Sequence, residues 1–134
     1  MSGGVYNVTL QDVHFKGALF ALRIKSARGR GGLVRDISVR DIVLEDVAMG
    51  LALTMRYADG DPAPPLDEHT PHFEGVTYAN ISGTALDAGA FLCLVESACR
   101  GIHMENINIT SIGGFICDRA FGTTSGVVIP ESCL

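Results

Sequence analysis

A phrase of seven residues recurs four times along the chain, and this repeat constrains the fold more than any other feature. The copies read NVTLQDV, DISVRDI, GVTYANI and GIHMENI. Each has Asn, Asp or Gly first, apolar residues second and fourth, Asp or Asn sixth, and an apolar residue last. They begin at Asn7, Asp36, Gly75 and Gly101, so the spacings are 29, 39 and 26 residues. Repeats of this length indicate a solenoid in which each unit packs against its neighbours.

The apolar residues alternate inside each copy, as Val8 and Leu10 do in the first. A period of two predicts a strand with one buried face. The Asp or Asn at the sixth position suits a bend, because these side chains bond locally and tolerate the left-handed backbone conformation. A second apolar run, such as GALFALRI or AFLCLV, follows each copy. The inward positions expected in the other three copies are Ile37, Val39, Val76, Tyr78, Ile102 and Met104.

Repeats built only from strands and corners predict an all-β fold, a parallel β-helix of about four coils with aliphatic ladders inside. The alternative is a β-sandwich, with a strand roughly every 8–12 residues. The recurrence of the Asp or Asn corner in register favours the solenoid. We therefore expect residues 1–134 to form a single β-helix segment. The Pro-rich, acidic stretch YADGDPAPPLDEHTPH predicts an inserted loop at 58–72.

The strand at residues 18–25 carries two cations in a pattern that calls for an explanation. Alternation sends its apolar set to the interior: Ala18, Phe20, Leu22 and Ile24. Arg23 and Lys25 then emerge side by side on the outer surface, roughly 6–7 Å apart along the strand. Neighbouring cations repel each other, so the pair favours an anion, and the Arg fork with the Lys point charge suits a carboxylate. The alternative is a solvated strand face that carries the two cations by chance.

Charge and hydropathy exclude several function classes. The net charge is −5 and the pI is near 5.2, which argues against a nucleic-acid partner, because such a protein needs a basic face. No apolar run reaches the roughly 18 residues of a membrane helix, so we expect no membrane partner. The first residues have neither a basic start nor an apolar core, so no signal peptide is expected in this chain.

Cysteines and glycosylation sequons favour an oxidising compartment. The four cysteines, an even number, allow three pairings: Cys93, Cys99, Cys117 and Cys133. Three sequons for N-glycosylation begin at Asn7, Asn80 and Asn108. A secreted character without a signal peptide fits a chain that is part of a longer protein.

Four segments in the same order resemble the polygalacturonases of glycoside hydrolase family 28. The segment RIKSARGRGGLVRDISVRDI resembles the family's RIK coil, and GLALTMRYADG resembles the next coil, in which a tyrosine follows the strand. The segments FLCLVESACRGIHMENINI and CDRAFGTTSGVVIPESC are similar to its later cysteine-containing coil and its cysteine-bracketed tail. The resemblance covers the chain from about residue 4 to residue 134.

This resemblance implies a right-handed parallel β-helix that hydrolyses α-1,4 bonds between galacturonates in pectin. Arg23 and Lys25 would hold the carboxylate of a galacturonate, and Tyr57 would line the same subsite. Alternation through Leu51, Leu53 and Met55 turns Tyr57 inward, so it reaches that surface only if the strand breaks at Arg56. The resemblance also implies disulfides Cys93–Cys99 and Cys117–Cys133, a disulfide-stapled tail at 117–134, and a secreted or cell-wall location for the parent protein.

The chemistry of the family needs a carboxylic acid and a carboxylate base. In the family these lie in Asn-Thr-Asp, Asp-Asp and Gly-His-Gly segments upstream of RIK, and none of these segments occurs here. We therefore assign no catalytic residue. Solvated surface carboxylates are the preferred interpretation of Asp87 and Glu96, and surface histidines that of His14 and His103. No metal site or cofactor is expected, because the acidic loop lacks ligand spacing: Asp59, Asp61, Asp67, Glu68, His69 and His72.

These observations predict the C-terminal part of a polygalacturonase-like pectin hydrolase that carries the carboxylate-binding side of the cleft. Its partners would be an acidic polysaccharide, pectin or polygalacturonate, and the missing N-terminal coils or another β-helix edge. The chain alone is expected to be inactive. One alternative is a non-catalytic galacturonan-binding or structural β-helix module. A further alternative, a pectate-lyase-like β-helix, needs calcium-binding carboxylates that the sequence does not show.

Overall fold

Every regular element of the structure is a β-strand. The computed structural model describes residues 3–57 and 69–134, and no helix occurs in these ranges. The strands are β1 (Gly4–Lys16), β2 (Phe20–Lys25), β3 (Leu33–Thr54), β4 (His72–Leu92), β5 (Cys99–Asp118) and β6 (Ala120–Ile129). The described residues accordingly contain no helix that could cross a membrane.

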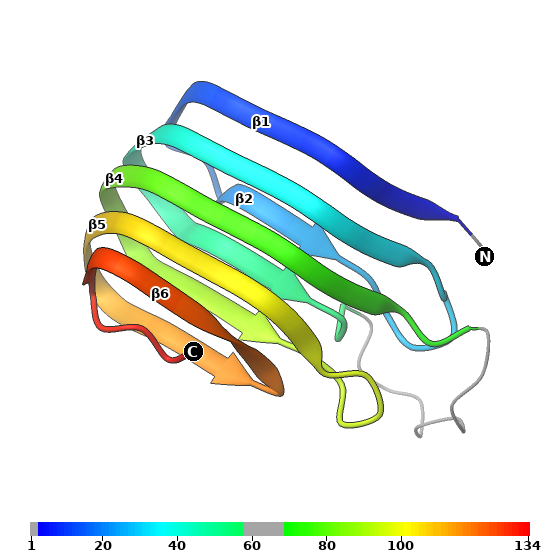
Figure 1. Cartoon of the computed structure of the whole chain (residues 1–134). Coiled ribbons are helices and arrows are strands. Elements are labelled where there is room, and N and C mark those ends of the chain that lie inside the picture. The colour runs from blue at the N-terminus through cyan, green and yellow to red at the C-terminus, as the bar shows by residue number, and fades with distance from the viewer. Residues whose placement is uncertain (1–2, 58–68) are drawn as a thin grey trace.

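The strands stack in parallel as the coils of a right-handed β-helix, which confirms the predicted fold class and excludes the sandwich (Figure 1). β1 and β2 form the first coil, while β3, β4 and β5 each bend to run through both layers of their own coil. Register follows the sequence repeat, since Val8 pairs with Ile37, Ile37 with Val76, and Val76 with Ile102. The spacing of the repeat is therefore the length of a coil.

The Asn, Asp and Gly residues of the repeat form the bends of each coil. Its first position has a left-handed backbone in all four copies, with φ of 57° at Asn7, 55° at Asp36 and 65° at Gly75 and Gly101. The sixth position does the same: Asp12, Asp41, Asn80 and Asn106, with φ between 51° and 58°. Asn, Asp and Gly are the residues that reach this region at low cost. The chain therefore turns twice in each repeat, at positions five residues apart. Both turns lie within the seven-residue phrase.

The core is a set of ladders that run through the coils, as the alternation predicted. Tyr78 and Met104 lie on one ladder and are completely buried, and the Tyr78 ring packs 6.0 Å from that of Phe91. The same ladder positions in β1 are different, because Val8 remains 44% exposed and Leu10 37% exposed. No described strand covers β1, so a hollow of about 510 Å³ opens into the interior there.

The loop and the tail are placed as follows. Residues 58–68 of the expected loop lie outside the described residues, and with them Asp59, Asp61, Asp67 and Glu68. β4 begins at His72, the last residue of that expected loop. Within 117–134, the strand β6 pairs with β5 and starts a further coil, and a Cys117–Cys133 disulfide joins the chain end to β5.

Candidate anion-binding site

Arg23 and Lys25 project from the outer face of β2, and both are exposed. The parallel ladder holds them rigidly, because Arg23 pairs with Ala52 and Lys25 with Thr54 on β3. None of the ion pairs between described residues involves either cation. The structure therefore presents two adjacent positive charges to solvent, as the sequence predicted.

Two aromatic rings flank these cations. The Arg23 guanidinium carbon lies 3.9 Å from the centroid of the Phe20 ring and 5.1 Å from that of Tyr57. The Lys25 ammonium lies 3.9 Å above the Tyr57 ring. A cation over an aromatic face is attracted by the ring quadrupole, at about 0.5–1 kcal/mol for an exposed site. The rings thus restrict the two cationic side chains to the same small surface.

The prediction that Phe20 faces the interior was wrong. Phe20 lines an outer groove with Arg23 and Met49, whereas Ala21, Leu22 and Ile24 line the interior. Two successive residues, Ala21 and Leu22, turn inward, and this shifts the alternation by one residue. The same shift occurs in β3, where Gly50 and Leu51 are the neighbours of Ala21 and Leu22. Both face the interior, because a side chain on Gly50 would meet the core residues Leu44 and Ile109, and Leu51 is buried. Strict alternation missed Phe20, and the only signal in the sequence is the unbroken apolar run at 18–22.

Tyr57 reaches the cation pair because β3 ends before it. Met55 is completely buried, and the regular strand has already stopped at Thr54. The backbone then turns, and the Tyr57 amide donates to the Ser26 carbonyl at 3.2 Å. This break meets the condition that the sequence set for Tyr57, and it leaves the ring 48% exposed on the outer surface.

The electrostatics of the site show which cations are available. A hydrogen bond donated by Lys25, the charge of Lys25 and then that of Arg23 lower the pKa of the Tyr57 hydroxyl. By contrast, Arg56 next to the site is neutralised, because its Nη2 donates to Asp118 Oδ2 and to the Cys93 carbonyl, both at 2.6 Å. Arg23 and Lys25 are therefore open anion-binding groups of this surface, and the charge of Arg30 also acts on Tyr57.

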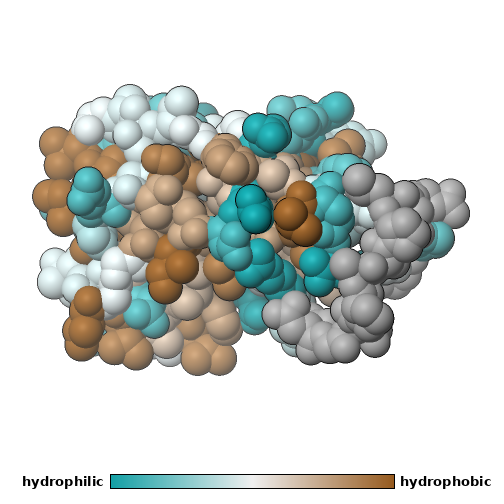
Figure 2. All heavy atoms as spheres, turned by 90° about the horizontal axis from the view of Figure 1, so that it is seen from below, coloured by the Kyte–Doolittle hydropathy of each residue, from teal (hydrophilic) through white to brown (hydrophobic). Residues whose placement is uncertain are grey.

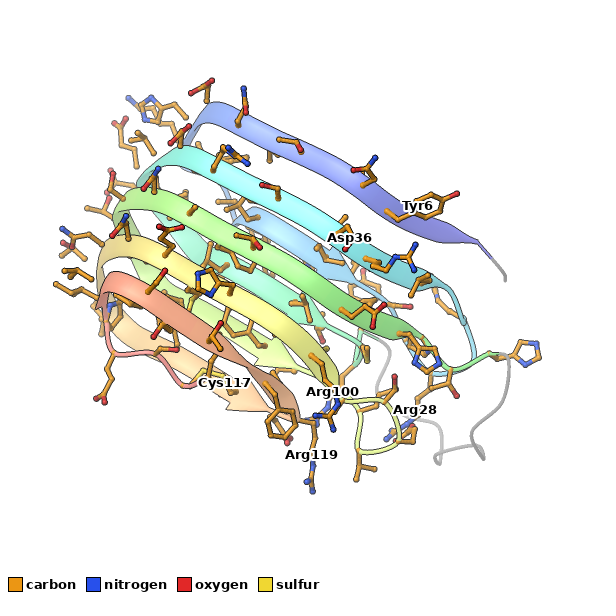
Figure 3. All side chains as sticks on the ribbon, viewed as in Figure 1. Tyr6, Arg28, Asp36, Arg100, Cys117 and Arg119 are labelled. Carbon is orange, nitrogen blue, oxygen red and sulfur yellow. A yellow bond between two sulfur atoms is a disulfide. The ribbon has the colours of Figure 1, made fainter. Side chains whose placement is uncertain are left out.

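Among the described carboxylates near this surface, Glu96 and Asp118 are engaged in ion pairs, whereas Asp87 is not. Arg28 donates to both oxygens of Glu96, at 2.6 and 3.3 Å, and lies beside the loop that follows β4 (Figure 3). Arg28 lowers the pKa of Glu96, which is the opposite of what a general acid requires. Asp118 is paired with Arg56. Asp87 lies beside Met49 in register, on β4.

The histidines considered as candidates lie on the surface of the coils. His14 pairs with Glu45 at 3.0 Å, and His103 contacts the hydroxyls of Thr123 and Ser125 at 2.7 and 3.0 Å. Among the residues that the structure describes, no group of three or more His, Cys, Asp or Glu side chains could hold a metal ion.

Both disulfides implied by the resemblance are present. Cys93 is joined to Cys99 across the loop after β4, and Cys117 to Cys133 at the end of the chain, with Cα–Cα distances of 5.8 and 5.6 Å. Figure 3 shows Cys117 beside the terminal segment.

The three sequon asparagines differ in their surroundings. Asn7 and Asn80 occupy left-handed corners, whereas Asn108 is exposed on β5. The Asn80 side chain already donates to Asp41 Oδ1 at 3.1 Å. The side chains of Asn7 and Asn108 make no such hydrogen bond among the described residues, so their amides are the more accessible of the three.

Comparisons with known proteins agree with this geometry. The sequence model of the glycosyl hydrolases of family 28 matches residues 2–127. A polygalacturonase of Prunus persica is 34% identical over 98% of this chain and 35% of its own length. An exopolygalacturonase of Zea mays is 26% identical over 96% of the chain and 34% of its own length.

An endo-polygalacturonase of Pectobacterium parmentieri is 27% identical over 81% of the chain and 26% of its own length. The chain thus spans about a third or less of the curated relatives compared here. No solved structure matches the chain at a significant level.

Proposed function

The chain belongs to glycosyl hydrolase family 28, and we propose that it forms the carboxylate-binding C-terminal part of a polygalacturonase-like pectin hydrolase. The observation that carries this proposal is the pair Arg23 and Lys25, rigid on β2, flanked by aromatic rings and unpaired among the described residues. A uronate offers a planar carboxylate for the Arg fork and an apolar ring face for Tyr57.

The catalytic carboxylates would lie outside this chain. Glu96 and Asp118 are held by arginines, and a carboxylate that is fixed in an ion pair is a poor general acid. The matched relatives are about three times longer, and the apolar ladder positions of β1 are exposed. Further coils that stack on β1 would cover Val8 and Leu10 and bring the acid and the base to the cation pair. Sequons and disulfides support a secreted or cell-wall location of the parent protein.

Binding of a charged oligosaccharide tests the carboxylate site. Trigalacturonate should bind better than maltotriose, a neutral trisaccharide, and its affinity should fall with salt because the site is open to solvent. Arg23→Ala should weaken binding about three- to fivefold, and more than Lys25→Ala, because exposed charge pairs contribute about 1 kcal/mol or less and Arg loses a two-pronged contact. Isothermal titration with circular dichroism as the folding control measures this. Equal affinity for acidic and neutral sugars would contradict the proposal.

Complementation tests the division of labour between the two parts. The purified chain should release no reducing ends from polygalacturonate, because positioning accelerates only a group that is present to react. Co-expression with the upstream portion of the Prunus persica polygalacturonase should restore release, and Arg23→Ala should reduce it. Turnover by the chain alone would refute the proposal. Tight galacturonan binding without complementation would favour a non-catalytic binding module.

A further inference from the structure

The outer groove beside the cation pair changes character from one coil to the next. Two columns of side chains cross its floor in register, and each begins with one of the two cations. Arg23 is followed by Ala52, Ala90 and Ile116, and Lys25 by Thr54, Leu92 and Asp118. The groove has a volume of about 310 Å³ and continues from Phe20 and Tyr57 to Ala90 and Leu92. A positive coil therefore adjoins two coils with a neutral, mainly apolar floor.

Two carboxylates lie beyond this neutral floor. Asp118 lies next to Leu92 in register, and Asp87 lies next to Met49. Asp118 is paired with Arg56, which is also bonded to the Cys93 carbonyl, and it lies 3.8 Å from Arg119, whereas Asp87 makes no ion pair among the described residues. A second carboxylate placed over Ala90 and Leu92 would lie on an apolar floor and approach the unpaired Asp87, whereas a neutral group would meet apolar side chains.

We propose that this groove is a second subsite that takes an uncharged, methyl-esterified galacturonate next to the free galacturonate bound by Arg23 and Lys25. The inference rests on the proposed function. Neighbouring coils are about 4.8 Å apart, which is close to the length of one sugar residue, so a chain that crosses the strands places one sugar on each coil. The ester methyl lies against Leu92 and Ala90, and the ester removes the charge that Asp87 would repel. The site thus selects partly esterified pectin.

Trisaccharides that carry methyl esters at defined positions test the second subsite directly, because each ester removes one negative charge and adds one methyl group. Titrations would compare unesterified trigalacturonate, its three positional isomers with one methyl ester each, and the fully esterified trimer. One singly esterified isomer should bind about two- to fivefold tighter than the unesterified trimer, the range expected for relief of an exposed charge repulsion. The fully esterified trimer should bind weakest, because it offers no carboxylate to Arg23.

Two variants and a matched control locate the effect. Leu92→Lys places a cation in the groove and should make the unesterified trimer the tightest ligand. Leu86→Lys adds the same charge at an exposed position that does not line the groove, so the preference for the singly esterified isomer should remain. Asp118→Asn removes a carboxylate and releases Arg56, so it should reduce that preference. Circular dichroism of each variant confirms that it is folded.

The outcomes separate this inference from the proposed function. If the unesterified trimer binds tighter than every singly esterified isomer, the second subsite is overturned while the carboxylate site remains. If the fully esterified trimer binds as tightly as the unesterified one, the carboxylate site itself is wrong. If Leu86→Lys inverts the preference as Leu92→Lys does, net charge rather than the groove sets the selectivity, and the inference fails.

Discussion

The two ends of the β-helix terminate the same ladders in opposite ways. At the β1 end, the ladder positions are Val8 and Leu10, and both are more than a third exposed. At the β6 end, the ladder that passes through Ile102 ends in Gly122, and the ladder that passes through Met104 ends in Thr124. A solenoid needs polar or small residues on a terminal coil, because nothing stacks on its outer side. By this criterion, β6 has the residues of a terminal coil, whereas β1 keeps apolar ladder positions exposed, as the proposed stacking of further coils requires.

The β6 end is also closed by a covalent bond and a packed tail. Cys133 and Leu134 pack against the core, and the Cys117–Cys133 disulfide fixes them to β5. Apolar residues remain on the outer surface here, among them Ile116 and Phe121, and Figure 2 shows apolar side chains over much of the molecule on this lower side. The interior beneath them is closed, since Ile102 and Met104 are at most 1% exposed. The comparison shows that exposure of the ladder, rather than apolar surface in general, distinguishes the open end.

The largest effect should come from placing one substitution at the same ladder position in two coils. Val76→Asp buries a carboxylate in the middle of the core and should cost about 4 kcal/mol or more, enough to unfold the chain. Val8→Asp lies on the same ladder at the open end and should change the free energy of unfolding by about 0.5 kcal/mol or less. Urea denaturation followed by circular dichroism measures both. Similar losses would show that the β1 end is not open in solution.

The closed end should depend on its disulfide. Replacing both Cys117 and Cys133 by Ser should lower the free energy of unfolding by about 3 kcal/mol, the value of the chain-entropy model for a loop of this length. Amide hydrogen exchange should rise most in β6 and the tail, and least in β1. If protection fell equally in all strands, the tail would not be a separate cap.

The stability of the first coil should depend on an ion pair instead. The Arg28–Glu96 pair joins the segment after β2 to the loop after β4. Arg28 lowers the pKa of Glu96, so its contribution is present above the usual Glu pKa and is lost as the pH falls through the lowered value. Glu96→Gln should cost about 1 kcal/mol at neutral pH and speed hydrogen exchange in β2. It should also flatten the acid-induced loss of stability below about pH 4.5. If Glu96→Gln left the loss of stability at low pH unchanged, the Arg28–Glu96 ion pair would not stabilise the first coil.

The smallest change in stability should come from capping the open end. Val8→Thr with Leu10→Thr gives β1 the polar character of β6 and should alter the free energy of unfolding by about 0.5 kcal/mol or less. The variant should keep its affinity for trigalacturonate, because Arg23 and Lys25 are untouched. It should lose complementation by upstream coils, because the apolar surface that they would bury has gone. Full complementation by this variant would show that β1 is not the stacking surface.

The sequence by itself determined the repeat architecture. Its spacing gave the length of each coil, because Asn, Asp and Gly are the residues that accept a left-handed bend, and the alternation between bends gave the buried ladders. The outward direction of Arg23 and Lys25 followed from the same alternation. Local backbone preferences and a period of two are properties of neighbouring residues, so they can be read from the chain without knowledge of distant contacts.

The tertiary structure alone decided the composition of the site. Phe20 faces outward because Ala21 and Leu22 both fit into the interior, and Tyr57 does so because β3 ends at Thr54. The neutral floor next to the cations consists of residues from two further coils, among them Ala52, Ala90 and Leu92. The length of an apolar run does not say at which residue the alternation shifts. That choice depends on which side chains the neighbouring coils leave room for, so it is made by packing across coils.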